Sequence, residues 1–160
     1  MLLVISCGYR PVRGTVPGGS DEIHVPSVIN KTPHPALAGP LTASVRRQLA
    51  KDGLHVVDKG HSAARLHITI YHIESKPGML TARDDQLIPL DSVWRIRIEA
   101  HITDPKGALI AGPEKLSVEG RAVAAGNPLF QESQGNRRLT TLLDELARAI
   151  SRQMFGSNRF

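Results

Sequence analysis

Histidine and carboxylate side chains are the first candidates for catalysis or metal binding in this chain. His67 and His101 fall on the polar sides of two predicted strands and could meet across them, while Asp84 and Asp85 are adjacent in a predicted loop. No two histidines have the i, i+4 spacing of a helical metal site, and neighbouring carboxylates in a loop diverge. The chain also lacks a nucleophile elbow, a P-loop and a dinucleotide-binding glycine motif. These residues favour surface histidines over a metal site, imply no cofactor and indicate that the protein is not an enzyme.

Cys7 is a candidate for covalent lipid attachment. It is the only cysteine, so an intramolecular disulfide is excluded. It ends an apolar run, and the stretch Val4–Cys7 resembles the lipobox that closes a lipoprotein signal. Acyl chains at this position would hold the protein on a membrane, because each buried methylene contributes about 0.8 kcal/mol. The alternative is a buried N-terminal strand in which Cys7 is an ordinary thiol.

Four arginines are candidates for binding an anion. Arg95, Arg97 and Arg121 fall on the polar sides of two predicted strands, and Arg83 lies in the long segment between residues 74 and 91. A planar guanidinium can bind a phosphate or a carboxylate through two hydrogen bonds. The formal net charge of +5 also favours a polyanionic partner. The alternative is a solvated sheet face on which these arginines meet only water.

Length and composition predict one globular domain. The chain has 160 residues, of which 41% are hydrophobic and 22% charged, enough to bury a single core. Aromatic residues make up 4%, which disfavours a base-stacking surface for nucleic acid. No apolar run approaches the roughly 20 residues of a membrane-spanning helix. We divide the chain into a lipoprotein signal remnant at 1–7, a flexible tether at 8–21, an α/β domain at 22–156 and a tail at 157–160.

The first half of the domain predicts a strand, a helix and a second strand. Residues 23–28 alternate as a short strand, and Pro26 predicts a sheet edge or a bulge because it lacks an N–H group. Prolines and a glycine predict a loop over 30–39. Apolar residues repeat every four positions over 40–51, which predicts a helix, and residues 54–57 form the next strand. The two strands should pair in parallel around the helix.

The second half predicts three longer strands and a final helix. Residues 94–103 give the clearest pattern, with apolar side chains on one face and polar ones on the other. Strands are also predicted at 66–70 and 116–121, and a long apolar stripe predicts a helix over 137–155. These elements indicate an α+β fold. It should be a two-layer α/β sandwich with a mixed, mostly antiparallel sheet of four to five strands and both helices on one face.

Charged residues of the final helix lead to two further predictions. Asp144 and Arg148 lie four positions apart and should pair on its outer face. Arg137 and Arg138 would open the helix, where positive charge opposes the helix dipole. They either bind an anion there or extend into solvent, and we prefer the solvent.

Several stretches of the chain, taken in order, resemble the LptE-type lipoproteins of lipopolysaccharide assembly. The tetrapeptide Cys7–Arg10 resembles the processed start of such proteins. The stretch Gly39–Gly53 resembles their first helix, and Leu54–Lys59 continues that likeness. The order of the elements fits the family over essentially the whole chain. Each motif is loose, and their order makes the resemblance specific.

The resemblance implies a lipoprotein that sits in the lumen of the outer-membrane β-barrel LptD. There it would plug the barrel, assist its assembly and take part in lipopolysaccharide transport and insertion at the cell surface. The implied partners are LptD, lipopolysaccharide and the outer membrane, through an anchor at Cys7 on the periplasmic side, with no nucleic acid. Arg83, Arg95, Arg97 and Arg121 are the candidate lipopolysaccharide-binding residues, chosen from charge and position.

Two other classes of function stay open at this point. One is a free-standing periplasmic lipoprotein that binds an anionic ligand without any barrel. The other is a cytosolic nucleic-acid-binding domain, which rests on the positive charge alone and requires Cys7 to be an ordinary residue.

Overall fold

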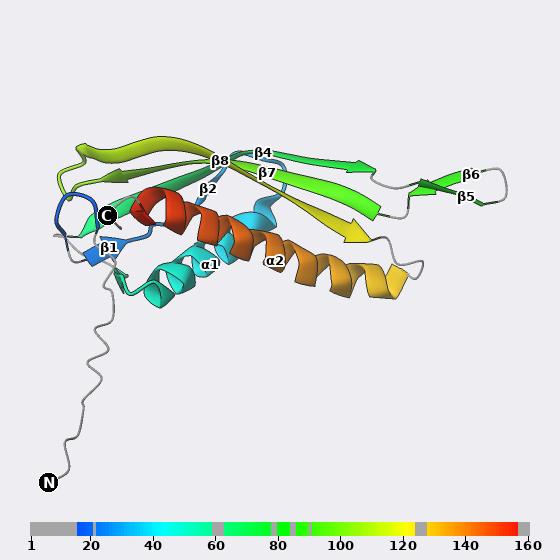
Figure 1. Ribbon diagram of the computed structural model, residues 1–160, viewed down its shortest axis with the longest axis horizontal. Coiled ribbons are helices and arrows are strands. Elements are labelled where there is room, and N and C mark those ends of the chain that lie inside the picture. The colour runs from blue at the N-terminus through cyan, green and yellow to red at the C-terminus, as the bar shows by residue number, and fades with distance from the viewer. Residues whose placement is uncertain are drawn as a thin grey trace, which may run out of the picture.

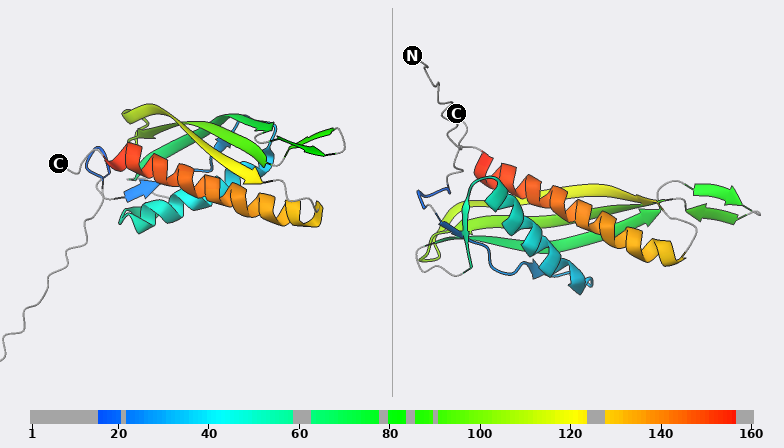
Figure 2. Two further views of the ribbon diagram at one scale, coloured as in Figure 1. Left: turned by 45° about the vertical axis from the view of Figure 1, so that its right-hand side comes forward. Right: turned by 90° about the horizontal axis from the view of Figure 1, so that it is seen from below.

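The computed structural model describes residues 16–20, 22–58, 63–77, 80–83, 86–89, 91–123 and 128–156. A long twisted sheet forms one layer, and both helices lie against one side of it and form the other layer (Figure 1, Figure 2). The predicted α+β sandwich with two helices on one face is therefore confirmed.

The main sheet is mixed, and its longest strands are antiparallel. Five strands follow the order β3-β1-β4-β7-β8, and β2 pairs with β4 beside this path. β1 runs parallel to β3 and β4, whereas β4, β7 and β8 form an antiparallel meander. The strand bounds are β1 (Glu22–His24), β2 (Ile29–Asn30), β3 (His55–Val57), β4 (Ala64–Pro77), β7 (Asp91–Thr103) and β8 (Leu109–Val123).

The first helix and its flanking strands form the predicted parallel unit. After a short 3-10 helix, η1 (Pro35–Leu37), helix α1 (Ala38–Lys51) begins two residues before the predicted position 40. α1 buries its apolar stripe completely against the core, and the chain turns away at Gly53, which has a φ of 83°. The predicted loop at 30–39 is only partly a loop, because β2, η1 and the start of α1 fall within it.

β1 lies inside the sheet, which corrects the prediction of an edge strand. It is hydrogen-bonded to β3 on one side and to β4 on the other. The strand ends at His24, before Pro26, so the missing N–H group of the proline interrupts no ladder. The core reaches further towards the N-terminus than the strand does. Val16, within the segment predicted as a tether, is 2% exposed and packs in the core.

The alternation predicted for residues 94–103 is confirmed in β7. Its apolar side chains from position 96 to position 102 are fully buried beneath the helices. The final helix, α2 (Pro128–Phe155), begins at Pro128 instead of 137. Arg137 and Arg138 therefore lie inside this helix and do not open it, so the dipole argument for an anion there is wrong.

Polar contacts join the two helices. Arg47 of α1 donates to Asp144 of α2 over 2.7 Å, so this carboxylate pairs across the helix interface, where the sequence predicted a pair with Arg148. The pKa of Asp144 is lowered, mainly by a hydrogen bond with Ser44 and then by Arg47, while burial opposes this shift. At the end of α1, Asp52 accepts a hydrogen bond from Ser151 of α2.

The described part of the long segment between residues 74 and 91, in which the sequence predicts a loop, forms strands. β4 continues to Pro77, and β5 (Leu80–Arg83) pairs antiparallel with β6 (Gln86–Pro89). This small hairpin projects from one end of the main sheet, at the far end from the C-terminal end of α2 (Figure 1). The acidic pair Asp84 and Asp85 lies outside the described residues.

Candidate functional site

The sheet face opposite the helices carries most of the titratable side chains that the sequence singled out. We call it the open face. It consists of polar residues from the three long strands, aligned in rows by the antiparallel register. Its members are His67, Thr69, His72 and Glu74 of β4; Arg95, Arg97, Glu99 and His101 of β7; and Lys115, Ser117 and Glu119 of β8. A bulge at Tyr71 shifts the register of β4, so that alternation resumes at His72 on the same face.

Arg95 is held by carboxylates from both neighbouring strands. Its Nη1 donates to Glu74 over 2.9 Å, and its Nε and Nη2 both donate to Oε2 of Glu119. Glu119 and then Glu74 raise the pKa of Arg95. Burial alone would raise the pKa of Glu74, but Lys76, His72 and Arg95 outweigh it and lower that pKa. The three side chains thus form a charged network whose arginine is already engaged.

Arg97 differs from Arg95 in its surroundings. It stands beside His72 and Ser117, which supply no carboxylate. Among the described residues, Arg97 has no hydrogen bond or ion pair, and its side chain is partly exposed. Its guanidinium can therefore bind an anion without first breaking a salt bridge.

His67 and His101 meet across β4 and β7, as the sequence suggested. They are directly opposed, and their rings stack with centroids 4.9 Å apart at 16°. Burial, followed by His101, lowers the pKa of His67, and Thr103 lies 3.2 Å from its Nε2. Within the described ranges, no group of three or more potential ligands is arranged to hold a metal ion. The two rings form a stacked element of the open face, and the lowered pKa of His67 favours its neutral form.

The structure brings three of the predicted anion-binding arginines into one region. Arg95 and Arg97 share the open face of β7, and the backbone of Arg121 pairs with Val93, one row from Arg95. Arg83 lies on the separate hairpin as the last residue of β5. Nothing is described of the side chains of Arg83 and Arg121, and Cys7 lies outside the described residues.

Sequence reasoning missed the carboxylates that occupy Arg95. The sequence places Glu74 at the start of the long segment between residues 74 and 91 and Glu119 in the predicted strand at 116–121. Only the register, which aligns both with Arg95, reveals the contact. Opposite charges at alternating positions of three strands were the available signal, but they do not fix which residues face each other.

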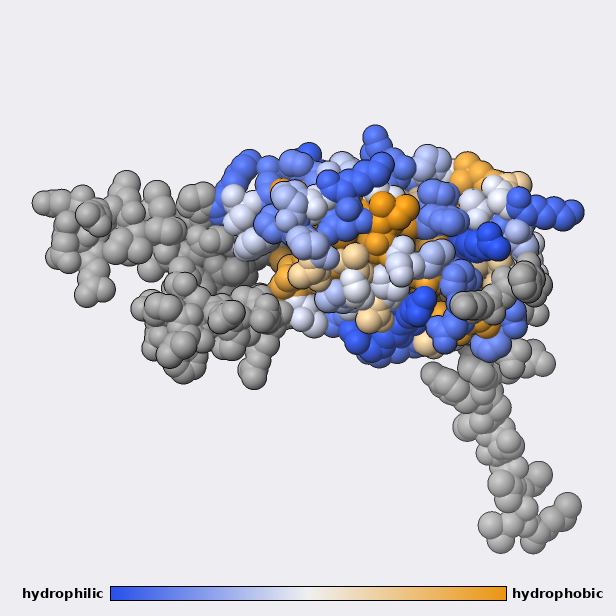
Figure 3. Space-filling view, turned by 180° about the vertical axis from the view of Figure 1, so that it is seen from behind, coloured by the Kyte–Doolittle hydropathy of each residue, from blue (hydrophilic) through white to orange (hydrophobic). Residues whose placement is uncertain are grey.

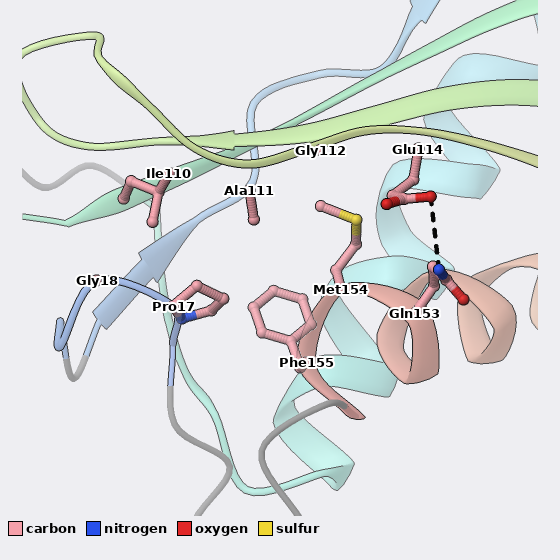
Figure 4. A pocket seen from close by; sticks show the side chains of 9 residues that line it. All are labelled: Pro17, Gly18, Ile110, Ala111, Gly112, Glu114, Gln153, Met154 and Phe155. Carbon is pink, nitrogen blue, oxygen red and sulfur yellow. Dashed lines mark hydrogen bonds between the residues drawn. The ribbon is translucent and has the colours of Figure 1, made fainter.

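A pocket of about 440 Å³ lies at the other end of the body, between the start of β8 and the end of α2 (Figure 4). Met154 and Phe155 point into it from α2, and Gln153 donates to Glu114 across its edge over 3.5 Å. The remaining lining residues are Pro17, Gly18, Ile110, Ala111 and Gly112. This pocket combines apolar walls with a polar rim but contains no catalytic constellation.

The face of the molecule seen in Figure 3 is largely hydrophilic, and its hydrophobic residues lie in several separate patches. The most exposed large apolar side chains in the described part are Ile29, Tyr71 and Leu109. None of the described helices is long and apolar enough to cross a membrane.

A comparison with protein-family models identifies one family. The model of the family LptE, described as lipopolysaccharide-assembly, matches residues 20–155. The comparison with curated proteins found no match.

Solved structures with the same fold come from several bacterial lipoproteins. A minor lipoprotein from Acinetobacter baumannii aligns with a TM-score of 0.59 at 15% identity, covering 84% of this chain and 90% of the other. A putative lipoprotein from Caulobacter crescentus aligns at 0.58 and 14% identity, covering 82% and 86%. The rare lipoprotein B from Shewanella oneidensis aligns at 0.55 and 12% identity, covering 83% and 92%. At these identities the likeness establishes the fold alone.

Proposed function

The chain belongs to the lipopolysaccharide-assembly family LptE, and on this premise we propose that it is a non-enzymatic outer-membrane lipoprotein that plugs the LptD β-barrel. In this role it assists assembly of the barrel and takes part in lipopolysaccharide transport and insertion at the cell surface. One observation carries the proposal: the family match extends over residues 20–155, so it includes every strand and both helices of the fold.

The open face supports this proposal through its polarity. A protein enclosed in a barrel meets a lumen that is lined by polar side chains and water. The open face presents charged and polar groups along three strands, and the Arg95 network keeps opposite charges paired on it. Such a face can contact a wet wall without exposing a large apolar surface.

Arg97 is the residue that we propose for direct contact with lipopolysaccharide phosphates. It is partly exposed, and no carboxylate in the described part of the chain forms a hydrogen bond or an ion pair with it, although the nearby charge of Arg97 helps to lower the pKa of Glu74. Arg95 takes a different role, because Glu74 and Glu119 already hold its guanidinium. Arg83 and Arg121 stay in the proposal from charge and backbone position, since both lie towards the hairpin end of the sheet.

A lipid anchor at Cys7 would hold one end of the molecule closer to the membrane than the other. Pro17 and Gly18, near the start of the described chain, line a pocket together with Met154 and Phe155 at the C-terminal end of α2. The β5–β6 hairpin projects from the opposite end (Figure 1). Acylation of Cys7 would fix the first end near the inner surface of the outer membrane. The hairpin would then point away from the point of attachment.

Co-expression with the LptD barrel of the same organism tests the proposal. The chain carries an affinity tag after Phe160, and the membrane fraction is purified in detergent. We expect the barrel to co-purify together with lipopolysaccharide. Arg97→Glu should lower the amount of retained lipopolysaccharide while the barrel stays bound, and Lys106→Glu, the same reversal on an exposed turn, should not.

Two results would contradict different parts of the proposal. Recovery of the chain without any barrel would reject the plug. It would favour a free-standing lipoprotein if the isolated chain still bound lipopolysaccharide through Arg97. Equal lipopolysaccharide retention by the Arg97→Glu and Lys106→Glu variants would instead reject the role of Arg97 and leave the plug standing.

A further inference from the structure

The outer edge of β8 is the longest free strand edge in the described part of the molecule. β8 runs from Leu109 to Val123 and pairs only with β7, because it ends the strand order of the main sheet. Its pairing with β7 is regular from position 114 onwards, after the register shifts around Ala100 and Ile102. A free edge presents a row of unpaired N–H and C=O groups that can bind another strand.

The apolar side of this edge is incompletely covered. Leu116 and Val118 are only partly buried, although Ile98 and Ile96, their direct neighbours on β7, are fully buried. α2 crosses this side of the sheet (Figure 2), and Leu116 and Val118 pack against the core without being fully buried. One more strand beside β8 would complete the burial of both side chains.

The charges on the other side of β8 are complementary to those of an antiparallel copy. Lys115 is exposed; it lies opposite Glu99 of β7 in the register but forms no ion pair with it or with any other described residue. Glu119 receives both hydrogen bonds from Arg95 on Oε2, which leaves Oε1 available, and its side chain is 47% exposed. Each copy therefore offers one available cation and one available carboxylate oxygen on the same edge.

We propose that two copies of this chain pair antiparallel through β8, with a twofold axis at Ser117, and form one continuous sheet. Lys115 then faces Glu119 of the second copy twice, and Leu116 faces Val118 twice. The twofold axis keeps the helix layers of both copies on the same side of the sheet. Because side chains alternate between the two faces, alternative registers of the two β8 strands differ by steps of two residues. The inference concerns the chain on its own and does not depend on the proposed function.

The neighbouring registers fit less well. An axis at Lys115 or at Glu119 places like charges directly opposite each other, which is unfavourable. An axis at Val118 sets Lys115 against Arg121. An axis at Leu116 sets the carboxylate of Glu114 against Val118. The register centred on Ser117 pairs opposite charges and apolar side chains at once.

Sedimentation of the purified full chain in detergent, over a concentration series, measures this pairing. The wild type should pass from monomer to dimer as concentration rises. Lys115→Glu places two carboxylates opposite each other twice and should weaken the dimer about tenfold or more. Lys106→Glu makes the same charge change on an exposed turn and should leave the dimer unchanged. A chain that stays monomeric at the highest concentration reached, or equal weakening by both variants, would overturn the proposal.

Disulfide trapping tests the register itself. Ser117→Cys places two thiols directly opposite each other, with Cβ atoms about 4.5–5.5 Å apart, so a small adjustment brings them within the range of about 3.5–4.5 Å that a disulfide spans. Arg97→Cys, in the same row on β7, lies three strand spacings or about 14 Å from its counterpart in the second copy. Mild oxidation should link the Ser117→Cys chains and leave the Arg97→Cys chains at the wild-type level, which also measures any background from Cys7. Equal linking of both variants would overturn the Ser117 axis.

Discussion

Replacing Gly120 with alanine should destabilise the protein, because α2 leaves no space for a methyl group on β8. A Cβ at this position would lie 2.2 Å from Cδ2 and 2.8 Å from Cγ of Leu142, whereas carbon atoms pack at about 3.5–4.0 Å. Leu142 is 7% exposed, and its neighbours Leu143 and Leu146 are buried. The Leu142 side chain or the helix must therefore shift, and close packing of the neighbouring core makes such a shift costly.

The expected cost follows from two opposing effects. Overpacking of this kind costs about 1–3 kcal/mol. The loss of glycine from the unfolded chain returns about 0.4–1 kcal/mol. We therefore expect the free energy of unfolding to fall by about 1–2 kcal/mol. Gly39→Ala is the matched control, because no atom lies within 4 Å of its added Cβ and it stands in the first turn of α1. That variant should be as stable as the wild type or slightly more so.

Urea unfolding measures both variants through the fluorescence of Trp94, the single tryptophan of the chain. A double-mutant cycle identifies the cause. Leu142→Ala removes the clashing atoms, so the double variant Gly120→Ala/Leu142→Ala should lose less stability than the sum of the two single variants. We expect a coupling of about 0.5–3 kcal/mol. A Gly120→Ala variant as stable as the wild type, or strictly additive effects, would refute this account of how α2 packs on β8.

Three further predictions concern the core and two titrating groups. Ile98→Ala removes a fully buried side chain and should cost about 2–5 kcal/mol in urea unfolding. Burial, with His101, lowers the pKa of His67 from 6.5, so the unfolded chain binds more protons and stability falls as the pH decreases through and below that value. His67→Gln should flatten this fall, measured as the urea midpoint from about pH 5 to 8. Ser44 lowers the pKa of Asp144, whose contribution is present above the ordinary carboxyl pKa and lost in more acidic solution; Asp144→Asn should reduce that acid-dependent loss.

The sequence predicts the layers of this fold well, because both layers follow from periodic apolar residues. Alternation over 94–103 identified the central strand β7, and the stripes of the two helices identified which of their faces are buried. A period of two or of 3.6 residues can be recognised in the sequence without knowing which elements pack against each other. The same reasoning failed where one residue was given a structural meaning on its own. Pro26 suggested an edge strand, yet β1 ends before it and lies inside the sheet.

The candidate site was less predictable because it depends on register. The sequence placed Arg95 and Arg97 on one polar face, but it could not distinguish them. In the structure, Arg95 forms ion pairs with Glu74 and Glu119, whereas Arg97 forms none in the described part and interacts with Glu74 only at longer range. Which residues face each other across strands is a tertiary property, and alternation alone leaves it open. The sequence also does not predict that α2 begins at Pro128, because the first turns of this helix lack a clear apolar stripe.

The copy number of the chain in a purified barrel complex tests the central claim most directly. The tagged chain and the LptD barrel are co-expressed and extracted from the outer membrane, and the molecular mass of the intact complex is measured in detergent. A plug predicts a single mass equal to one barrel plus one copy of this chain. Recovery of the chain from this membrane without the barrel, or a measured mass equal to the barrel alone, would contradict the account.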